Sequence, residues 1–184
     1  MNIIWKLGQT LAAVVLAAGL LAHGAHASEH LNVTADGLAM DGFDVVSYFN
    51  ASKPAKGTGE FTHEYRDATW VFKTAENRDL FAAEPAKYEP RYNGWCANAV
   101  SKGYAADVDF VNGWAVIDGS LHLFWAYGTK HNFFSDVTAK RVRAEDNWPT
   151  VFAGIVDGTV KFPRHSEHFD RLGITHPQEL PEEG

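Results

Sequence analysis

The stretch EFTHEYRDATWVFKT, residues 60–74, contains two runs in which apolar and polar residues alternate. Alternation of this kind is typical of strands with one buried face. Asp67 and Ala68 stand between the two runs, so we expect a β-hairpin that turns there. Each strand then turns its aromatic-rich face toward the core, and these faces carry Phe61, His63, Tyr65, Trp70 and Phe72.

Helical signals flank this hairpin on both sides. Downstream, Thr74 is placed to cap a helix over residues 75–83, which Pro85 ends or restarts as a short turn. Upstream, Asp44 is placed to cap a short helix in DVVSYF, residues 44–49.

A second hairpin is predicted in GWAVIDGSLHLFWAY, residues 113–127, around Asp118 and Gly119. This dipeptide tolerates the positive φ angles of a type I′ turn. Pairing Val116 with Leu121 gives a core face made of Trp114, Val116, Leu121, Leu123 and Trp125. Residues 95–103 are helical in propensity and end at Gly103, and residues 129–149 are largely helical up to Pro149. The sequence therefore predicts a small compact α+β domain, with two β-hairpins forming an antiparallel sheet and several short packing helices.

The first 27 residues have the pattern of a secretory signal peptide. Lys6 precedes an apolar run over residues 11–22, and Ala25 and Ala27 precede the expected cut before Ser28. We expect the domain to cover residues 28–150, followed by a C-terminal extension over residues 151–184. No later apolar stretch has the length of a transmembrane helix, so a periplasmic or secreted location is predicted.

The composition and motifs of the chain exclude some classes of partner and of enzyme. The chain carries a formal net charge of -7, which argues against nucleic acid as a partner. Its 46% hydrophobic residues are sufficient for a packed core. No nucleophile elbow, phosphate loop or dinucleotide fingerprint is present, so no common enzyme class is indicated.

Cys96 is the only cysteine, so no disulfide can form within the chain. If a helix begins near Trp95, the sulfur lies in its first turn, where free N–H groups favour the thiolate. A thiolate is both a nucleophile and a metal ligand. The alternative is that Cys96 is a small buried hydrophobic residue, as free cysteines often are.

Several separated blocks of the chain resemble the YHS-domain family, in its branch of small exported bacterial (seleno)proteins. They are DGFDVVSYF, KPAKGTGEFTHEY, the stretch from residue 68 to residue 104, GWAVIDGSLHLFW and AEDNWP. The resemblance covers about residues 33–150 and implies a YHS-like α+β fold and an association with metals, copper above all. It also implies that the position of Cys96 is chemically active. The strand TWVFKT lacks the cysteine that metal-handling relatives tend to carry, which excludes a site with several cysteines.

Histidines supply the remaining candidate ligands. We expect Cys96 to anchor a site for copper or another transition metal that is completed by one or more of His63, His122 and His131. Two of them have a structural alternative: His63 would be a hydrogen-bonded core residue or lie at a sheet margin, and His122 would border solvent opposite the tryptophan-rich face. His131 lies near the start of a predicted helix, and its role stays open. His30 and the tail residues His165, His168 and His176 offer weaker, exposed sites.

Three functions follow from these observations. The first is an exported metal-associated protein that handles copper, with a metal ion and a periplasmic redox or metal-transfer protein as partners. The second is a thiol redox protein in which Cys96 forms a mixed disulfide or a sulfenic acid. The third is a non-catalytic binding module.

Overall fold

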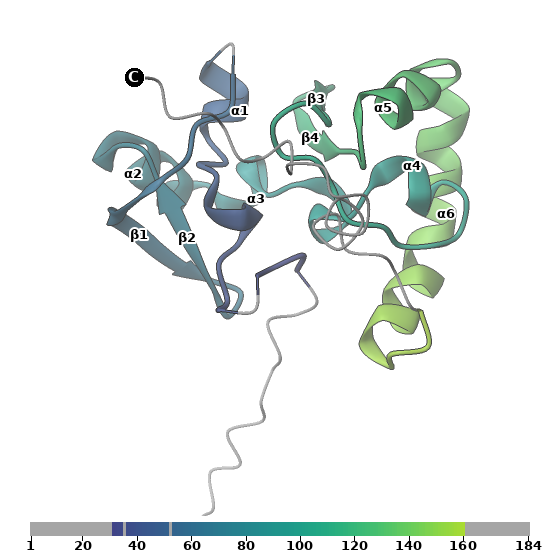
Figure 1. Cartoon of the computed structure of the whole chain (residues 1–184), viewed down its shortest axis with the longest axis horizontal. Coiled ribbons are helices and arrows are strands. Elements are labelled where there is room, and N and C mark those ends of the chain that lie inside the picture. Colours follow the sequence, from purple (N-terminus) through teal and green to yellow (C-terminus); the bar gives the residue numbers. More distant parts are fainter. Residues whose placement is uncertain (1–30, 35, 52, 161–184) are drawn as a thin grey trace, which may run out of the picture.

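The computed structural model describes residues 31–34, 36–51 and 53–160. Two small antiparallel two-stranded sheets and a set of mostly short helices make up an α+β fold (Figure 1). The elements in chain order are η1 (Met40–Gly42), α1 (Ser47–Asn50), β1 (Thr58–Tyr65), β2 (Ala68–Phe72), α2 (Ala75–Ala83), α3 (Pro85–Tyr88), η2 (Arg91–Gly94), α4 (Ala97–Val100), β3 (Trp114–Ile117), β4 (Ser120–Leu123), α5 (Tyr127–Phe134) and α6 (Val137–Val156). The α+β class is confirmed, but each hairpin forms its own sheet.

The first hairpin turns one residue earlier than expected. Tyr65 pairs with Ala68, so Arg66 and Asp67 form the turn, with φ angles of 52° and 54°. Two left-handed residues in a two-residue loop match the twist of the flanking strands. Along β1 the exposed and half-buried residues alternate as predicted, with Phe61, His63 and Tyr65 on the half-buried face.

The second hairpin has the predicted register. Val116 pairs with Leu121, and Asp118 and Gly119 turn the chain with φ angles of 48° and 76°. The predicted core face is only partly buried: Leu121 and Leu123 are fully enclosed, Trp114 and Trp125 are half-buried, and Val116 is exposed. The hairpin therefore buries β4 more deeply than β3.

Of the two predicted helix caps, the one at Thr74 forms. The Thr74 hydroxyl accepts a hydrogen bond from the Asn77 N–H at 3.2 Å, at the start of α2. Asp44 is fully buried, and its carboxylate accepts bonds from the N–H groups of Val46 and Ser47 as the chain enters α1. Thr74 thus satisfies an N–H group that a helix start leaves free, whereas the N-cap of α1 is Val46 and Asp44 holds the turn that precedes it.

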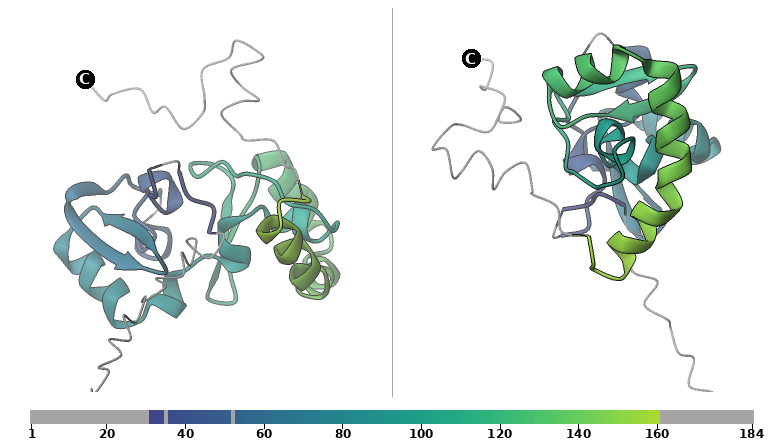
Figure 2. Two further views of the ribbon diagram at one scale, coloured as in Figure 1. Left: turned by 90° about the horizontal axis from the view of Figure 1, so that it is seen from below. Right: turned by 90° about the vertical axis from the view of Figure 1, so that its right-hand side faces the viewer.

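The prediction that the last helix stops at Pro149 is wrong. α6 continues through Pro149 to Val156, and thus through residue 150, where the domain boundary was expected. Pro149 lies exposed, whereas Ala144, Val151 and Gly154 of the same helix are buried. Proline costs a helix one backbone hydrogen bond, but its fixed φ is compatible with helical geometry, and packing of the buried face holds the helix together. In the right-hand view of Figure 2, α6 runs along one side of the molecule.

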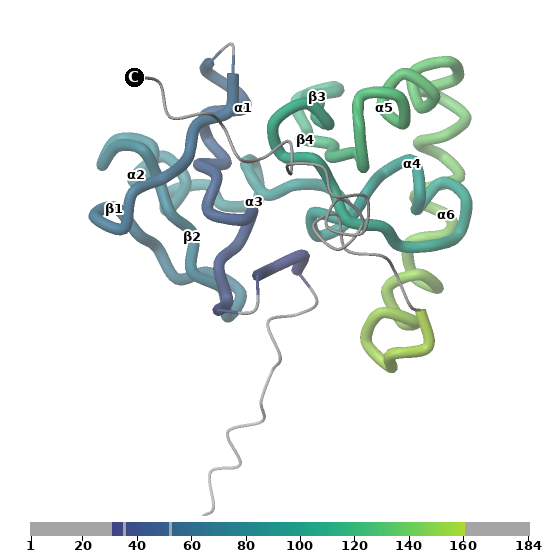
Figure 3. Tube along the Cα trace, viewed as in Figure 1, coloured from purple at the N-terminus to yellow at the C-terminus, as the bar shows by residue number. Residues whose placement is uncertain are grey.

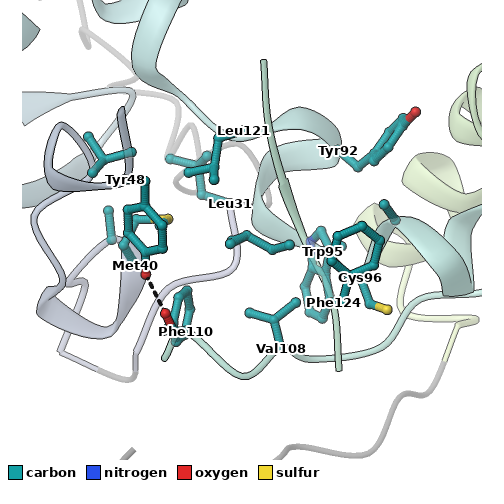
Figure 4. Close-up of a cluster of buried hydrophobic side chains, with 14 of the residues drawn as sticks. Leu31, Met40, Tyr48, Tyr92, Trp95, Cys96, Val108, Phe110, Leu121 and Phe124 are labelled. Atoms are coloured by element: carbon teal, nitrogen blue, oxygen red, sulfur yellow. Dashed lines mark hydrogen bonds between the residues drawn. The ribbon is translucent and has the colours of Figure 1, made fainter. Parts of the chain in front are cut away.

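The segment before η1 hydrogen-bonds both to the part of the chain around Asn93 and Asp107 and to β2. Asn32 donates from its backbone N–H to the Asn93 carbonyl at 2.9 Å and from its side chain to Asp107 at 2.8 Å. Further on, the Ala39 N–H donates to the Thr69 carbonyl in β2 at 3.0 Å, and Figure 3 shows this part of the chain beside β2. The buried hydrophobic side chains around both sheets form one core cluster, part of which is drawn in Figure 4.

Within the described part of the chain, no helix is both long enough and apolar enough to cross a membrane. The expected signal peptide, residues 1–27, and nearly all of the tail beyond α6 lie outside the described residues.

Candidate functional site

Cys96 lies at the end of a sharp reversal of the backbone. Tyr92, Asn93 and Gly94 have positive φ angles of 55°, 51° and 84°. Left-handed conformations are unfavourable for residues such as tyrosine and are retained only where the surrounding structure imposes them. After the reversal the Cys96 N–H donates to the Ala106 carbonyl at 3.0 Å, which fixes the cysteine immediately before α4.

The Cys96 sulfur is enclosed but accepts a hydrogen bond. Only 1% of the residue is exposed, and Sγ accepts from the Trp125 N–H at 3.2 Å, just beyond the end of β4. The N–H groups of Asn98 and Ala99 also act on the sulfur, without forming a regular helix cap. Figure 4 shows the sulfur at the edge of the core cluster, on the side away from Met40 and Tyr48.

The expectation of an ionised thiol is wrong. Burial raises the pKa of Cys96 above its ordinary value, and this effect exceeds the opposing effects of the nearby N–H groups and of Lys102. The expected helix over residues 95–103 is reduced to one turn, Ala97–Val100, followed by turns that end at Gly103. A helix of one turn offers little dipole to offset the loss of hydration. Cys96 is therefore a neutral thiol at pH 7.

A pocket of about 230 Å³ adjoins this thiol. Its lining combines the sulfur with apolar, amide and hydroxyl-bearing residues: Cys96, Asn98, Ala99, Tyr104, Ala106, Trp125 and Thr129. Tyr104 is 46% exposed, so the pocket extends from the buried sulfur toward solvent. Ligand pockets commonly measure roughly 300 to 1,000 Å³, so this one fits a small group rather than a large cofactor.

None of the three histidines proposed as ligands, His63, His122 and His131, lines this pocket. His63 is half-buried on β1, and its ring packs edge-to-face on Phe81 at 5.9 Å between centroids. This contact agrees with the structural alternative that places His63 against the core. His131 is exposed on α5.

The structural alternative for His122, a residue that borders solvent, is wrong, because only 1% of the residue is exposed. Its ring lies near those of Tyr92 and Phe133, so both faces of β4 are covered. Nδ1 lies 3.0 Å from the Ser120 carbonyl, to which it donates in the neutral tautomer, and Nε2 has no partner among the described residues. Burial is the largest cause that lowers the pKa of His122.

Acidification is therefore expected to destabilise the fold through His122. Because the folded state holds His122 neutral, its contribution to stability is complete above the unfolded pKa of about 6.5 and is lost as the pH falls toward the folded pKa. Between these two values the loss is about 1.4 kcal/mol for each pH unit. Urea unfolding at pH 7.5, 6.0 and 5.0 measures it. The His122→Phe variant, which cannot titrate, should lose less stability over this range; equal losses in both proteins would contradict the account.

The described residues do not fit the expected copper site. They contain no group of three or more histidine, cysteine, aspartate or glutamate side chains placed to hold a metal ion. Apart from the thiol, the side-chain donors that line the Cys96 pocket are an amide and hydroxyls, which suit hard cations better than copper. His30, His165, His168 and His176 lie outside the described residues.

Asn98, Thr129 and the Trp125 N–H were missed by the sequence patterns. Asn98 stands two residues after Cys96, but nothing in its type or spacing distinguishes it from a solvent-facing helical residue. Trp125 contributes a backbone group, which carries no sequence signal.

No protein-family model, no curated protein and no solved structure matches this chain.

Proposed function

We propose that this chain is an exported single-cysteine thiol protein, whose Cys96 exchanges with a small disulfide bound in the adjoining pocket. One observation carries the proposal: the sulfur that accepts the Trp125 N–H lies in the lining of a small pocket. A cysteine that served only as core filling would need neither the pocket nor the donor.

The proposed reaction is thiol–disulfide exchange. The Cys96 sulfur loses its proton to solvent and attacks one sulfur of a small disulfide RSSR, forming a Cys96–S–S–R bond while the RS–SR bond breaks. The second half leaves as RS⁻ and takes up a proton as RSH. Because the chain has no second cysteine, the mixed disulfide persists until an external thiol reduces it.

The surroundings of the Cys96 sulfur would protect it from oxidation at rest and also assist its reaction with a small disulfide. The raised pKa keeps Cys96 protonated at rest, and burial excludes large reagents, so an oxidising compartment does not readily oxidise it. Loss of the proton leaves negative charge on the Cys96 sulfur before it attacks, and this charge passes to the leaving sulfur as the new bond forms. The Trp125 N–H already points at the Cys96 sulfur and stabilises its thiolate without rearrangement.

Metal association and family membership stay predictions from the resemblance to YHS-domain proteins. A copper site at Cys96 would need ligands other than those lining the pocket. The metal content of the purified protein and of its Cys96→Ser variant tests this: metal in stoichiometric amounts that the variant loses would favour the copper function over thiol exchange.

The proposed function is tested with residues 28–184, reduced and then mixed with bis(2-hydroxyethyl) disulfide at pH 7.5. We expect the intact mass to increase by a single half-disulfide, in full yield and reversibly on addition of a reducing thiol. The Cys96→Ser variant, which keeps the size of the side chain, should gain no mass. A folded wild-type protein that stays unmodified while its urea-unfolded form reacts would mark Cys96 as an inert core residue.

A further inference from the structure

The first hairpin has an open edge along β1. The sheet contains only β1 and β2, and on the far side of β2 the segment 37–39 bonds to Thr69, so β1 is the outer strand (Figure 1). Within the part of the chain that the structure describes, no other segment pairs with β1. The unpaired edge of a strand presents N–H and C=O groups that can bind another strand.

The backbone groups that point outward from this edge are those of Thr62 and Glu64. Tyr65 and Ala68 flank the two-residue turn and therefore exchange hydrogen bonds, as does every second pair along the hairpin. Thr62 and Glu64 lie between such pairs, so their N–H and C=O groups are directed away from β2. Their side chains are also exposed. Among the described residues, this edge is thus open to a partner strand.

Charge favours one register for a second copy of the same strand. Two copies of β1 can run antiparallel about a two-fold axis at His63. Glu60 of each copy then lies opposite Arg66 of the other, which gives pairs of opposite charge. Thr62 of each copy lies opposite Glu64 of the other. Moving the axis by one residue in either direction places two glutamates opposite each other, and such like-charge pairs are destabilising.

The same register also covers apolar surface. Phe61 and Tyr65 are half-buried and lie on one face of β1, where Tyr65 packs on Phe81 of α2 at 5.6 Å between ring centroids. With the axis at His63, Phe61 of one copy lies opposite Tyr65 of the other. Aromatic pairs across neighbouring strands stabilise a sheet. A second copy would therefore bury aromatic surface that one copy leaves partly exposed.

We propose that two copies of this chain associate through β1 and form one four-stranded antiparallel sheet, in the order β2–β1–β1–β2. The association is separate from thiol exchange, because none of the residues that line the Cys96 pocket lies in β1. One strand from each copy makes a small interface, and small interfaces belong to weak complexes. We expect a reversible dimer with a dissociation constant between about 1 µM and 1 mM.

Sedimentation equilibrium of residues 28–184 at pH 7.5 measures this dimer, with a reducing thiol present so that no disulfide joins two copies. Thr62→Lys should tighten the dissociation constant about fivefold, because the two-fold axis places each new lysine opposite Glu64. Thr62→Glu should weaken it about fivefold for the opposite reason. Thr62 is exposed and pairs with the neutral Val71 in its own chain, so both variants should fold. If both variants weakened the dimer, the axis would not lie at His63 and the proposal would be overturned.

A second pair of variants tests the backbone contact. Thr62→Pro removes an N–H group that the pairing with β2 does not use, so the hairpin should persist while the dimer is lost. Thr62→Ala is the matched control, because it keeps the N–H group, and it should dimerise to within about twofold of the wild type. Circular dichroism verifies that both variants are folded. A wild-type protein that stays monomeric up to about 1 mM, or a dimer that persists in folded Thr62→Pro, would overturn the proposal.

Discussion

Replacing Gly113 with alanine is expected to lower the free energy of unfolding by about 3 kcal/mol, the upper part of the range for overpacking. A Cβ at this position would lie 2.1 Å from the Phe124 carbonyl oxygen and 2.8 Å from the Asp109 carbonyl oxygen. Both obstacles are backbone atoms. They cannot rotate away as a flexible side chain would, so the chain itself has to shift. Urea unfolding monitored by tryptophan fluorescence measures the loss.

The same substitution should disturb the thiol. The Phe124 N–H donates to the Gly113 carbonyl at 2.7 Å, and the Phe124 carbonyl accepts from the Asp109 N–H at 3.0 Å. The next residue is Trp125, whose N–H bonds the Cys96 sulfur. Moving the Phe124 carbonyl displaces this donor, so the remaining folded Gly113→Ala protein should react more slowly with small disulfides.

Gly128→Ala is the matched control. Gly128 lies in α5 and does not need a positive φ, and a Cβ added there would meet no heavy atom within 4 Å beyond its chain neighbours and its own helix backbone. This variant should be as stable as the wild type or more stable by up to about 1 kcal/mol, since alanine favours a helix more than glycine does. If the two variants were similarly stable, the fold would not depend on the close approach of the Phe124 carbonyl oxygen to Gly113.

Raising the pH above about 8.5, the ordinary thiol value, is expected to remove the stability that Cys96 contributes. Burial raises the pKa of Cys96 in the folded state, so the unfolded chain ionises first. The contribution is complete below the unfolded pKa and is lost as the pH rises through the folded pKa. Over that interval the loss is about 1.4 kcal/mol for each pH unit.

Comparison with Cys96→Ala isolates this effect, because the tyrosines and lysines that also titrate at alkaline pH are the same in both proteins. Urea unfolding at pH 7.0, 9.0 and 10.0 should show a stability difference that is largest at pH 7.0 and shrinks as the pH rises. A difference that stays constant to pH 10.0 would mean that the folded and unfolded thiols ionise alike.

Short-range patterns predicted the local structure well. The Asp118–Gly119 turn set the register of the second hairpin, and Thr74 caps α2 as expected, because each of these features depends on a few neighbouring residues. The first turn was misplaced by one residue, since Arg66 adopts a left-handed conformation that its residue type does not favour.

Tertiary packing decided what the sequence did not reveal. Strand alternation assigned His122 to a face, but whether that face meets solvent depends on Tyr92 and Phe133, which come from distant parts of the chain. α6 passes Pro149 because its opposite side is buried. The pKa of Cys96 follows from burial by the whole fold, whereas the sequence argument considered only the start of one helix.

The most direct test of exchange at Cys96 is the rate constant of the folded protein divided by the fraction of Cys96 that is ionised. The rate constant for mixed disulfide formation with bis(2-hydroxyethyl) disulfide is measured over a range of pH for the folded and the urea-unfolded chain. A thiolate titration of each state gives the ionised fraction. Because a thiol of raised pKa gives the stronger nucleophile and the pocket positions the disulfide, the folded thiolate should react at least about threefold faster than the unfolded one. A folded thiolate that reacts more slowly than the unfolded one would contradict the account.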